Sequence, residues 1–133
     1  MFFLDTNICI FILNGKYPDL NKQYLKCARG EIGIPTVVLF ELYYGAEKSK
    51  SQALNRTKIQ EFISEVEIVS FDAHAAEIAG KIRADLERAG KIIGNNDLLI
   101  SATALAYNGV VVTNNTREFS RIEGLVVEDW TVG

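Results

Sequence analysis

Short apolar runs and longer helical stretches alternate along this chain, and the alternation limits the folds open to it. The runs are rich in β-branched residues and predict strands at 2–4, 32–35, 66–71, 109–113 and 125–129. Helical spacing of apolar residues predicts helices at 7–14, 18–29, 36–47, 51–64, 72–89 and 96–107. Strands joined through helices form right-handed crossovers and a parallel sheet covered on both faces. We therefore expect an α/β protein, a three-layer α/β/α sandwich with a mostly parallel central sheet of about five strands.

Helix-boundary signals support this division. Asp72 is placed to cap the fifth predicted helix, which should end at Gly90. Thr36, after a proline, is a candidate cap for the third. Asn95 or Asn96 is a candidate cap for the last.

Length and charge restrict the class of protein further. A chain of 133 residues with no repeat or linker predicts one domain, 1–133. The net charge of −3 argues against a protein that grips nucleic acid through a broad basic face. A nuclease with a small acidic site stays open, because a bound metal ion would supply positive charge there.

The sequence also indicates a compartment. The start, MFFLD, lacks the basic stretch and cleavage site of a signal peptide, and no apolar run approaches the length of a membrane span. We expect a cytoplasmic protein with no membrane partner. Cys9 and Cys27 show no ligand-like spacing, so we expect reduced thiols.

Two acidic residues stand in unusual surroundings. Asp5 directly follows the first predicted strand, where a carboxylate is a good helix cap as well as a candidate ligand. Glu41 lies in the apolar helix TVVLFELYYGAE without a positive residue at helical spacing. Burying such a carboxylate costs several kcal/mol unless something neutralises it. It either points to solvent, bonds a backbone amide, or belongs to a site.

Two more acids fall near the same predicted edge of the sheet. Asp97 opens the helix DLLISATALA, where the helix dipole alone favours an acid by about 0.3–1 kcal/mol. Glu118 follows the fourth strand and has Arg117 and Arg121 as candidate ion-pair partners. Each acid taken singly has a structural explanation.

Taken together, the four acids predict a cation site. In parallel sheets, ligands bind beyond the carboxyl ends of the strands. Carboxylates about 4 Å apart repel by about 4 kcal/mol at an effective dielectric of 20, so a cluster must protonate or bind a cation. Oxygen ligands without Cys or His suit Mg²⁺ or Mn²⁺, which can clamp a phosphodiester and activate a water against it.

The motifs LDTNI, VVLFELYYG, IGNNDLLISATAL, VTNNTREF and GLVVEDW, in this order and spacing, resemble those of PIN-domain proteins. The resemblance covers residues 2 to about 130 and is strongest to the VapC toxins of bacterial toxin–antitoxin pairs. It implies a PIN-like fold and a magnesium-dependent endoribonuclease, in which Mn²⁺ can replace Mg²⁺. It also implies a homodimer inhibited by a VapB-type antitoxin. RNA is the implied substrate, and the TNNTREF variant suggests tRNA.

The resemblance also assigns residues. Asp5, Glu41 and Asp97 match the first three catalytic acids of the family, with Asp5 and Asp97 as leading metal ligands. Many relatives carry Asp where this chain has Asn115, so Glu118 is the candidate for the fourth catalytic acid. Four neighbours of the acids are further candidates: Thr6 and Thr113 as hydrogen-bond donors to the carboxylates, Asn115 to orient a ligand or a water, and Asn7 without an assigned role.

Two alternative functions are kept. Asn115 favours a PIN-like binding module, for nucleic acid or protein, with impaired catalysis. A phosphatase of the haloacid-dehalogenase type also begins with an apolar strand and an Asp, but Asn7 replaces the second Asp of its motif. His74, the single histidine, is predicted to be a surface or core-edge residue.

Overall fold

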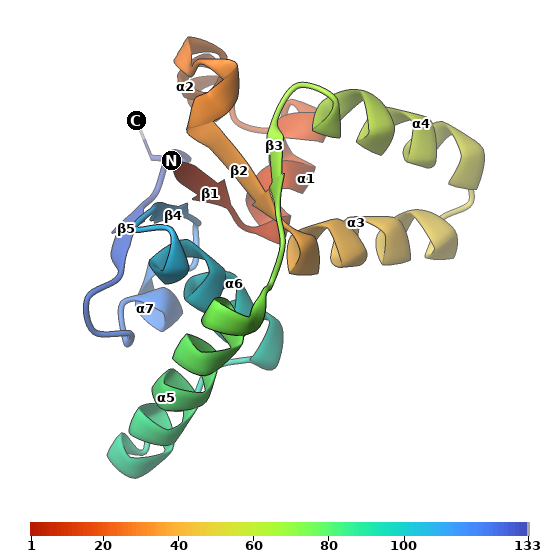
Figure 1. Cartoon of the computed structure of the whole chain (residues 1–133). Coiled ribbons are helices and arrows are strands. Elements are labelled where there is room, and N and C mark those ends of the chain that lie inside the picture. The colour runs from red at the N-terminus through yellow and green to blue at the C-terminus, as the bar shows by residue number, and fades with distance from the viewer. Residues whose placement is uncertain (133) are drawn as a thin grey trace.

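The computed structural model describes residues 1–132 and confirms the predicted alternation of strands and helices (Figure 1). The strands are β1 (Phe2–Leu4), β2 (Ile32–Pro35), β3 (Glu67–Val69), β4 (Val110–Val112) and β5 (Val126–Glu128). The helices are α1 (Thr6–Asn14), α2 (Pro18–Lys26), α3 (Thr36–Lys48), α4 (Gln52–Ile63), α5 (Ala73–Ala89), α6 (Asn95–Ala106) and α7 (Thr116–Phe119), with a 3₁₀ turn at Arg29–Glu31.

All five strands are parallel and lie in the order β3-β2-β1-β4-β5. The chain moves outward from β1 to β3 and then crosses back to β4, so the strand order reverses between β1 and β4. Right-handed crossovers place α1–α4 on one face of the sheet and α5–α7 on the other. The expected three-layer architecture is confirmed. In such sheets the crevice beyond the carboxyl ends of the two strands at the reversal is the usual ligand site.

The core lies where the central strands meet the helices. Phe3, Val111, Ile34 and Ile100 are fully buried there. The ring of Phe3 packs directly over Gly109, where an added Cβ would lie 2.3 Å from its Cε2 atom. A glycine just before β4 therefore lets the central strand carry a large aromatic ring.

The helix ends confirm some predictions and correct others. The Asp72 carboxylate caps α5, and Gly90 ends that helix in the left-handed conformation, as predicted. Thr36 is not the cap of α3: the cap position is Pro35, and the Thr36 hydroxyl instead accepts the Phe71 N–H at 3.2 Å. Neither candidate asparagine caps α6, because its cap position is Gly94 and carries no side chain. A tertiary contact, described below, occupies that position.

Helices α3 and α4 pack against each other and extend away from the sheet as a helical pair (Figure 1). Phe40 and Tyr44 are exposed on α3, with stacked rings whose centroids lie 6.4 Å apart. This pair therefore presents aromatic surface away from the core.

Other sequence predictions concern the chain as a whole. Cys9 and Cys27 are both free thiols, as predicted, and His74 is exposed on α5. In the stretch 1–132, every helix is too short or too polar to cross a lipid bilayer.

Candidate active site

Strand ends and helix starts bring the predicted acids to one edge of the sheet. Asp5 directly follows β1, and Thr113 directly follows β4, the two strands at which the order reverses. Asp97 lies in the first turn of α6, and Glu41 lies on α3. The fold thus places the predicted residues around the crevice where ligands bind in parallel sheets.

Asp5 is both a helix cap and a member of the acidic cluster. It is 5% exposed, and its Oδ1 atom accepts the Ile8 N–H at 2.9 Å. Its Oδ2 atom accepts the Thr113 hydroxyl at 2.5 Å. Burial raises the pKa of Asp5, and the carboxylates of Glu41 and Asp129 raise it further, against the lowering effect of the two hydrogen bonds. The two interpretations of Asp5 left open by the sequence are therefore compatible.

Glu41 points toward α1. Its Oε1 atom accepts the Thr6 hydroxyl at 2.7 Å, so the partner of this carboxylate is a side chain and not the backbone amide considered above. Glu41 also lies on the wall of a groove of about 260 Å³ between α1, α3 and α4. The groove is lined by Ile10, Leu13, Asn14, Glu41, Leu42, Gly45, Ala46, Asn55, Lys58 and Ile59.

Asp97 shows most clearly that the acids act on one another. Burial raises the pKa of Asp97 to about 6, and the charges of Glu118, Asp5 and Glu41 contribute to the rise in that order. A carboxyl group shifted in this way, at the carboxyl edge of a parallel sheet and among the charges of three other acids, is typical of a functional site. The four predicted acids form one electrostatic cluster.

Glu118 joins the cluster in a different way. Its Oε1 atom accepts the Gly94 N–H at 2.7 Å, and its Oε2 atom accepts the Asn115 side-chain amide at 3.0 Å. These two hydrogen bonds lower the pKa of Glu118. The predicted ion pair of Glu118 with Arg117 or Arg121 is wrong: among the described residues, neither guanidinium forms a salt bridge with Glu118. The Arg121 guanidinium instead donates to the Ile92 carbonyl at 2.8 Å.

The remaining candidates fall into two groups. Thr6 and Thr113 donate to Glu41 and Asp5, as expected of residues that orient carboxylates. Thr113 also accepts the Asn115 N–H at 2.9 Å, which connects it to Asn115. Asn7 is exposed in the first turn of α1, away from these contacts.

One acidic residue was missed. Asp129 directly follows β5, and its charge contributes to the raised pKa of Asp5. The signal in the sequence is the one that identified Asp5: an acid placed immediately after an apolar strand, here in LVVED. In the folded protein Asp129 accepts both the N–H and the hydroxyl of Thr131, at 2.8 and 2.6 Å.

The chemistry of the cluster fits a hard divalent cation in donor type and in charge. Its candidate ligands are carboxylate oxygens, without thiolate or imidazole among them. Mutual repulsion, visible in the raised pKa of Asp97, is what a cation would relieve. Through residue 132, no three Asp, Glu, His or Cys side chains are yet gathered closely enough to hold an ion. The carboxylates of Asp5, Glu41 and Glu118 instead accept hydrogen bonds from protein donors.

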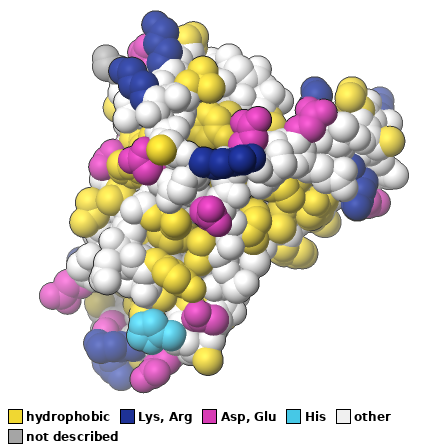
Figure 2. Space-filling view, turned by 45° about the horizontal axis from the view of Figure 1, so that its top comes forward, with side chains coloured by type: hydrophobic (Ala, Val, Ile, Leu, Met, Phe, Trp, Pro, Cys, Tyr) yellow, Lys and Arg dark blue, Asp and Glu magenta, His cyan; other side chains and the backbone are white. Residues whose placement is uncertain are grey.

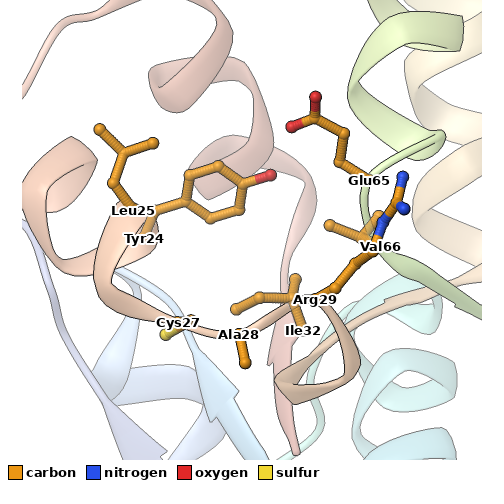
Figure 3. Close-up of a pocket in the computed structure, with 8 residues that line it drawn as sticks. All are labelled: Tyr24, Leu25, Cys27, Ala28, Arg29, Ile32, Glu65 and Val66. Atoms are coloured by element: carbon orange, nitrogen blue, oxygen red, sulfur yellow. The ribbon is translucent and has the colours of Figure 1, made fainter.

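A second hollow lies at the opposite edge of the sheet. It is an open hollow of about 400 Å³ near the starts of β2 and β3, and it is lined by Tyr24, Leu25, Cys27, Ala28, Arg29, Ile32, Glu65 and Val66 (Figure 3). Glu65 is its single carboxylate, and the Arg29 guanidinium donates to the Ser64 carbonyl beside it. This hollow does not fit a cation held by several acids.

Charge is dispersed over the face of the molecule shown in Figure 2. Acidic and basic side chains alternate there among hydrophobic and neutral ones, and the described residues in that view form no continuous basic patch. The view agrees with the overall net charge of −3.

Comparison with known proteins gives consistent results. The PIN domain family model matches residues 2–125. The chain is 45% identical to ribonuclease VapC2 of Rickettsia felis and 42% identical to the tRNA(fMet)-specific endonuclease VapC of Shigella flexneri, each over 98% of both proteins. Its fold is similar to VapBC2 from Rickettsia felis bound to a promoter DNA fragment, with a TM-score of 0.91 and 42% identity over 97% of this chain and 98% of the other.

Proposed function

The chain belongs to the PIN-domain family, within its VapC ribonucleases, and from that premise we propose that it is a magnesium-dependent endoribonuclease and the toxin of a toxin–antitoxin pair. RNA is its substrate, and tRNA is the favoured class because a similar protein is named a tRNA(fMet)-specific endonuclease. The observation that carries the proposal is the cluster of four acids at the strand-order reversal.

The carboxylates of Asp5 and Asp97 would hold the metal ion, with Glu41 beside them. When bound, Mg²⁺ supplies positive charge to a phosphodiester and lowers the pKa of a bound water. The chain's own residues provide orientation. The Thr113 hydroxyl holds Asp5, and the Thr6 hydroxyl holds Glu41, so two of the carboxylates are kept in fixed rotamers.

The same proposal includes an inhibitory partner. Structures similar to this chain are VapBC complexes, so we expect a VapB-type antitoxin here. The groove between α1, α3 and α4 is its proposed docking surface, because apolar residues line much of the groove and Glu41 lies on its wall. A basic antitoxin side chain reaching Glu41 would neutralise one acid of the cluster. The aromatic surface of α3 is available to the antitoxin or to a second copy in a homodimer.

Cleavage of a total tRNA and rRNA pool tests the enzyme. The antitoxin-free protein should cleave RNA with Mg²⁺ and not with EDTA. Asp5→Asn should lose at least a hundredfold of this activity, because asparagine keeps an oxygen for the Ile8 N–H but loses the charge that would hold the metal.

Asp72→Asn is the matched control. Asp72 caps α5 with the same contact, its Oδ1 atom accepting the Ala75 N–H at 2.9 Å, outside the cluster. It should cleave RNA as the wild type does. Equal activity of the wild type and Asp5→Asn, or activity that persists in EDTA, would overturn the proposal. A complete absence of cleavage would favour the binding-module alternative.

A further inference from the structure

We propose that Glu118 is a positioning residue that sets the start of α6, and with it Asp97, through the Gly94 N–H, and that it is not itself a metal ligand. This inference rests on the proposed function, since it concerns how the metal-binding carboxylates are held. It departs from the expectation that Glu118 supplies the fourth acid of the site.

The start of α6 depends on Glu118. The cap position of this helix is Gly94, which has no side chain to accept hydrogen bonds from the first turn. The Gly94 carbonyl accepts the Leu98 N–H at 3.0 Å, so Gly94 begins the helical ladder. Its own N–H is donated to Glu118, 24 residues away in sequence. Because Asp97 follows in the first turn, fixing Gly94 fixes the backbone that carries Asp97.

A second contact ties α7 to the same loop. The Arg121 guanidinium, just after α7, donates to the carbonyl of Ile92 at 2.8 Å. Glu118 therefore holds the Gly94 N–H, and Arg121 holds the Ile92 carbonyl. Two contacts from one segment to one loop define its position better than either would alone.

Glu118 is in turn held by Asn115. The Asn115 side-chain amide donates to the second oxygen of Glu118, and the Asn115 N–H donates to the Thr113 hydroxyl, which donates to Asp5. A continuous hydrogen-bonded path therefore joins Asp5 to the start of α6. An amide at 115 suits this path, because an Asp there would place a carboxylate oxygen where the donating amide nitrogen now lies, 3.0 Å from the Glu118 Oε2 atom.

Glutamine and alanine at position 118 separate the two roles of Glu118. Glutamine keeps a side-chain oxygen that can accept the Gly94 N–H, but it lacks the negative charge of a carboxylate ligand. Alanine removes both the oxygen and the charge. Glu118→Gln is therefore the matched control for Glu118→Ala. At position 94, alanine keeps the N–H, and its Cβ would lie 3.7 Å from the Glu118 Oε1 atom, an ordinary contact.

The readout is Mn²⁺ binding to the antitoxin-free protein, measured by electron paramagnetic resonance. We expect Glu118→Ala to weaken binding about tenfold or more, because the start of α6 and Asp97 lose their hold. Gly94→Ala should bind within about twofold of the wild type. Glu118→Gln keeps an accepting oxygen for Gly94 and should retain most of the affinity.

The opposite pattern overturns the inference. If Glu118 is a ligand, Glu118→Gln loses Mn²⁺ binding as fully as Glu118→Ala does. Wild-type protein that binds no Mn²⁺ contradicts the proposed function instead. The positioning role is then tested without metal, by hydrogen exchange at the Leu98 amide, which should be at least tenfold faster in Glu118→Ala than in Glu118→Gln. Equal rates would contradict it.

Discussion

Two aspartates in this chain make the same capping contact, but their pKa values are shifted in opposite directions. Asp5 and Asp72 each accept a first-turn N–H at 2.9 Å. The pKa of Asp72 is lowered, first of all by that hydrogen bond. The pKa of Asp5 is raised, because burial and nearby carboxylates outweigh the same bond. Capping could be predicted for both residues from sequence, but the difference depends on charges that only the fold brings together.

Asp97 should make the metal-free protein sensitive to pH. Its pKa is about 6 when folded, against 3.8 for the free group, so the folded state binds the proton more tightly. The free energy of unfolding should therefore fall as pH rises from about 4 to about 6. Asp97→Asn cannot ionise, and at pH 7.5 it should be more stable than the wild type by about 1 kcal/mol, after allowing for solvent screening.

Urea denaturation in EDTA at pH 4 and pH 7.5 checks this prediction. The two proteins should have equal stability at pH 4 and differ at pH 7.5, and Asp97→Asn should have lost RNA cleavage. If Asp97 only interacts with the helix dipole, the variant would instead be less stable at pH 7.5 by a few tenths of a kcal/mol.

For the helices and strands, the sequence predicted those helix boundaries that are determined by contacts within the helix itself. Helix α5 has its own cap at Asp72 and its own stop at Gly90, and both were legible in the sequence. The start of α6 could not be predicted in this way. The N–H of its cap residue, Gly94, donates to Glu118, which lies 24 residues later in the sequence. The short helix α7 was also missed, since four residues are too few for a periodic pattern.

Two glycines should respond oppositely to alanine. At Gly109 an added Cβ would lie 2.3 Å from the Phe3 ring and 3.0 Å from the Met1 carbonyl oxygen, so Gly109→Ala should destabilise by about 1–3 kcal/mol. Gly80 is exposed inside α5, and a Cβ there meets nothing within 4 Å. Gly80→Ala should stabilise by about 0.5–1 kcal/mol.

Thermal denaturation of both variants measures the difference. The melting temperature should fall for Gly109→Ala and rise for Gly80→Ala. A melting temperature for Gly109→Ala at or above that of the wild type would show that Phe3 can move aside and that its packing does not depend on the glycine.

For the whole molecule, the fold class and the four acids of the cluster followed from pattern and resemblance, and Asp129 was missed. Alternation predicted the sheet, and the carboxyl-edge rule predicted where Asp5 would lie. The strand order could not be read from the pattern, because it depends on which edges the helices leave free. The bond from Thr113 to Asp5 was likewise hidden, since it joins residues 108 positions apart.

Metal should stabilise the whole fold. Mn²⁺ or Mg²⁺ at a hundred times its dissociation constant should add about 2.7 kcal/mol to the free energy of unfolding, if it binds the folded state alone. The effect should be larger at pH 7.5 than at pH 5.5, where Asp97 is largely protonated. Differential scanning calorimetry of the wild type, Asp97→Asn and Asp72→Asn would test it. An equal shift in Asp97→Asn would place the ion elsewhere.

The long separation between Asp5 and its partner has a consequence during protein synthesis. Asp5 and β1 leave the ribosome before the neighbouring strand β4, and Thr113 follows Asp5 by 108 residues. At about 5–20 residues per second, Thr113 is added roughly 5–22 s after Asp5. A nascent chain that does not yet include Thr113 therefore carries the first acid of the cluster without an assembled site.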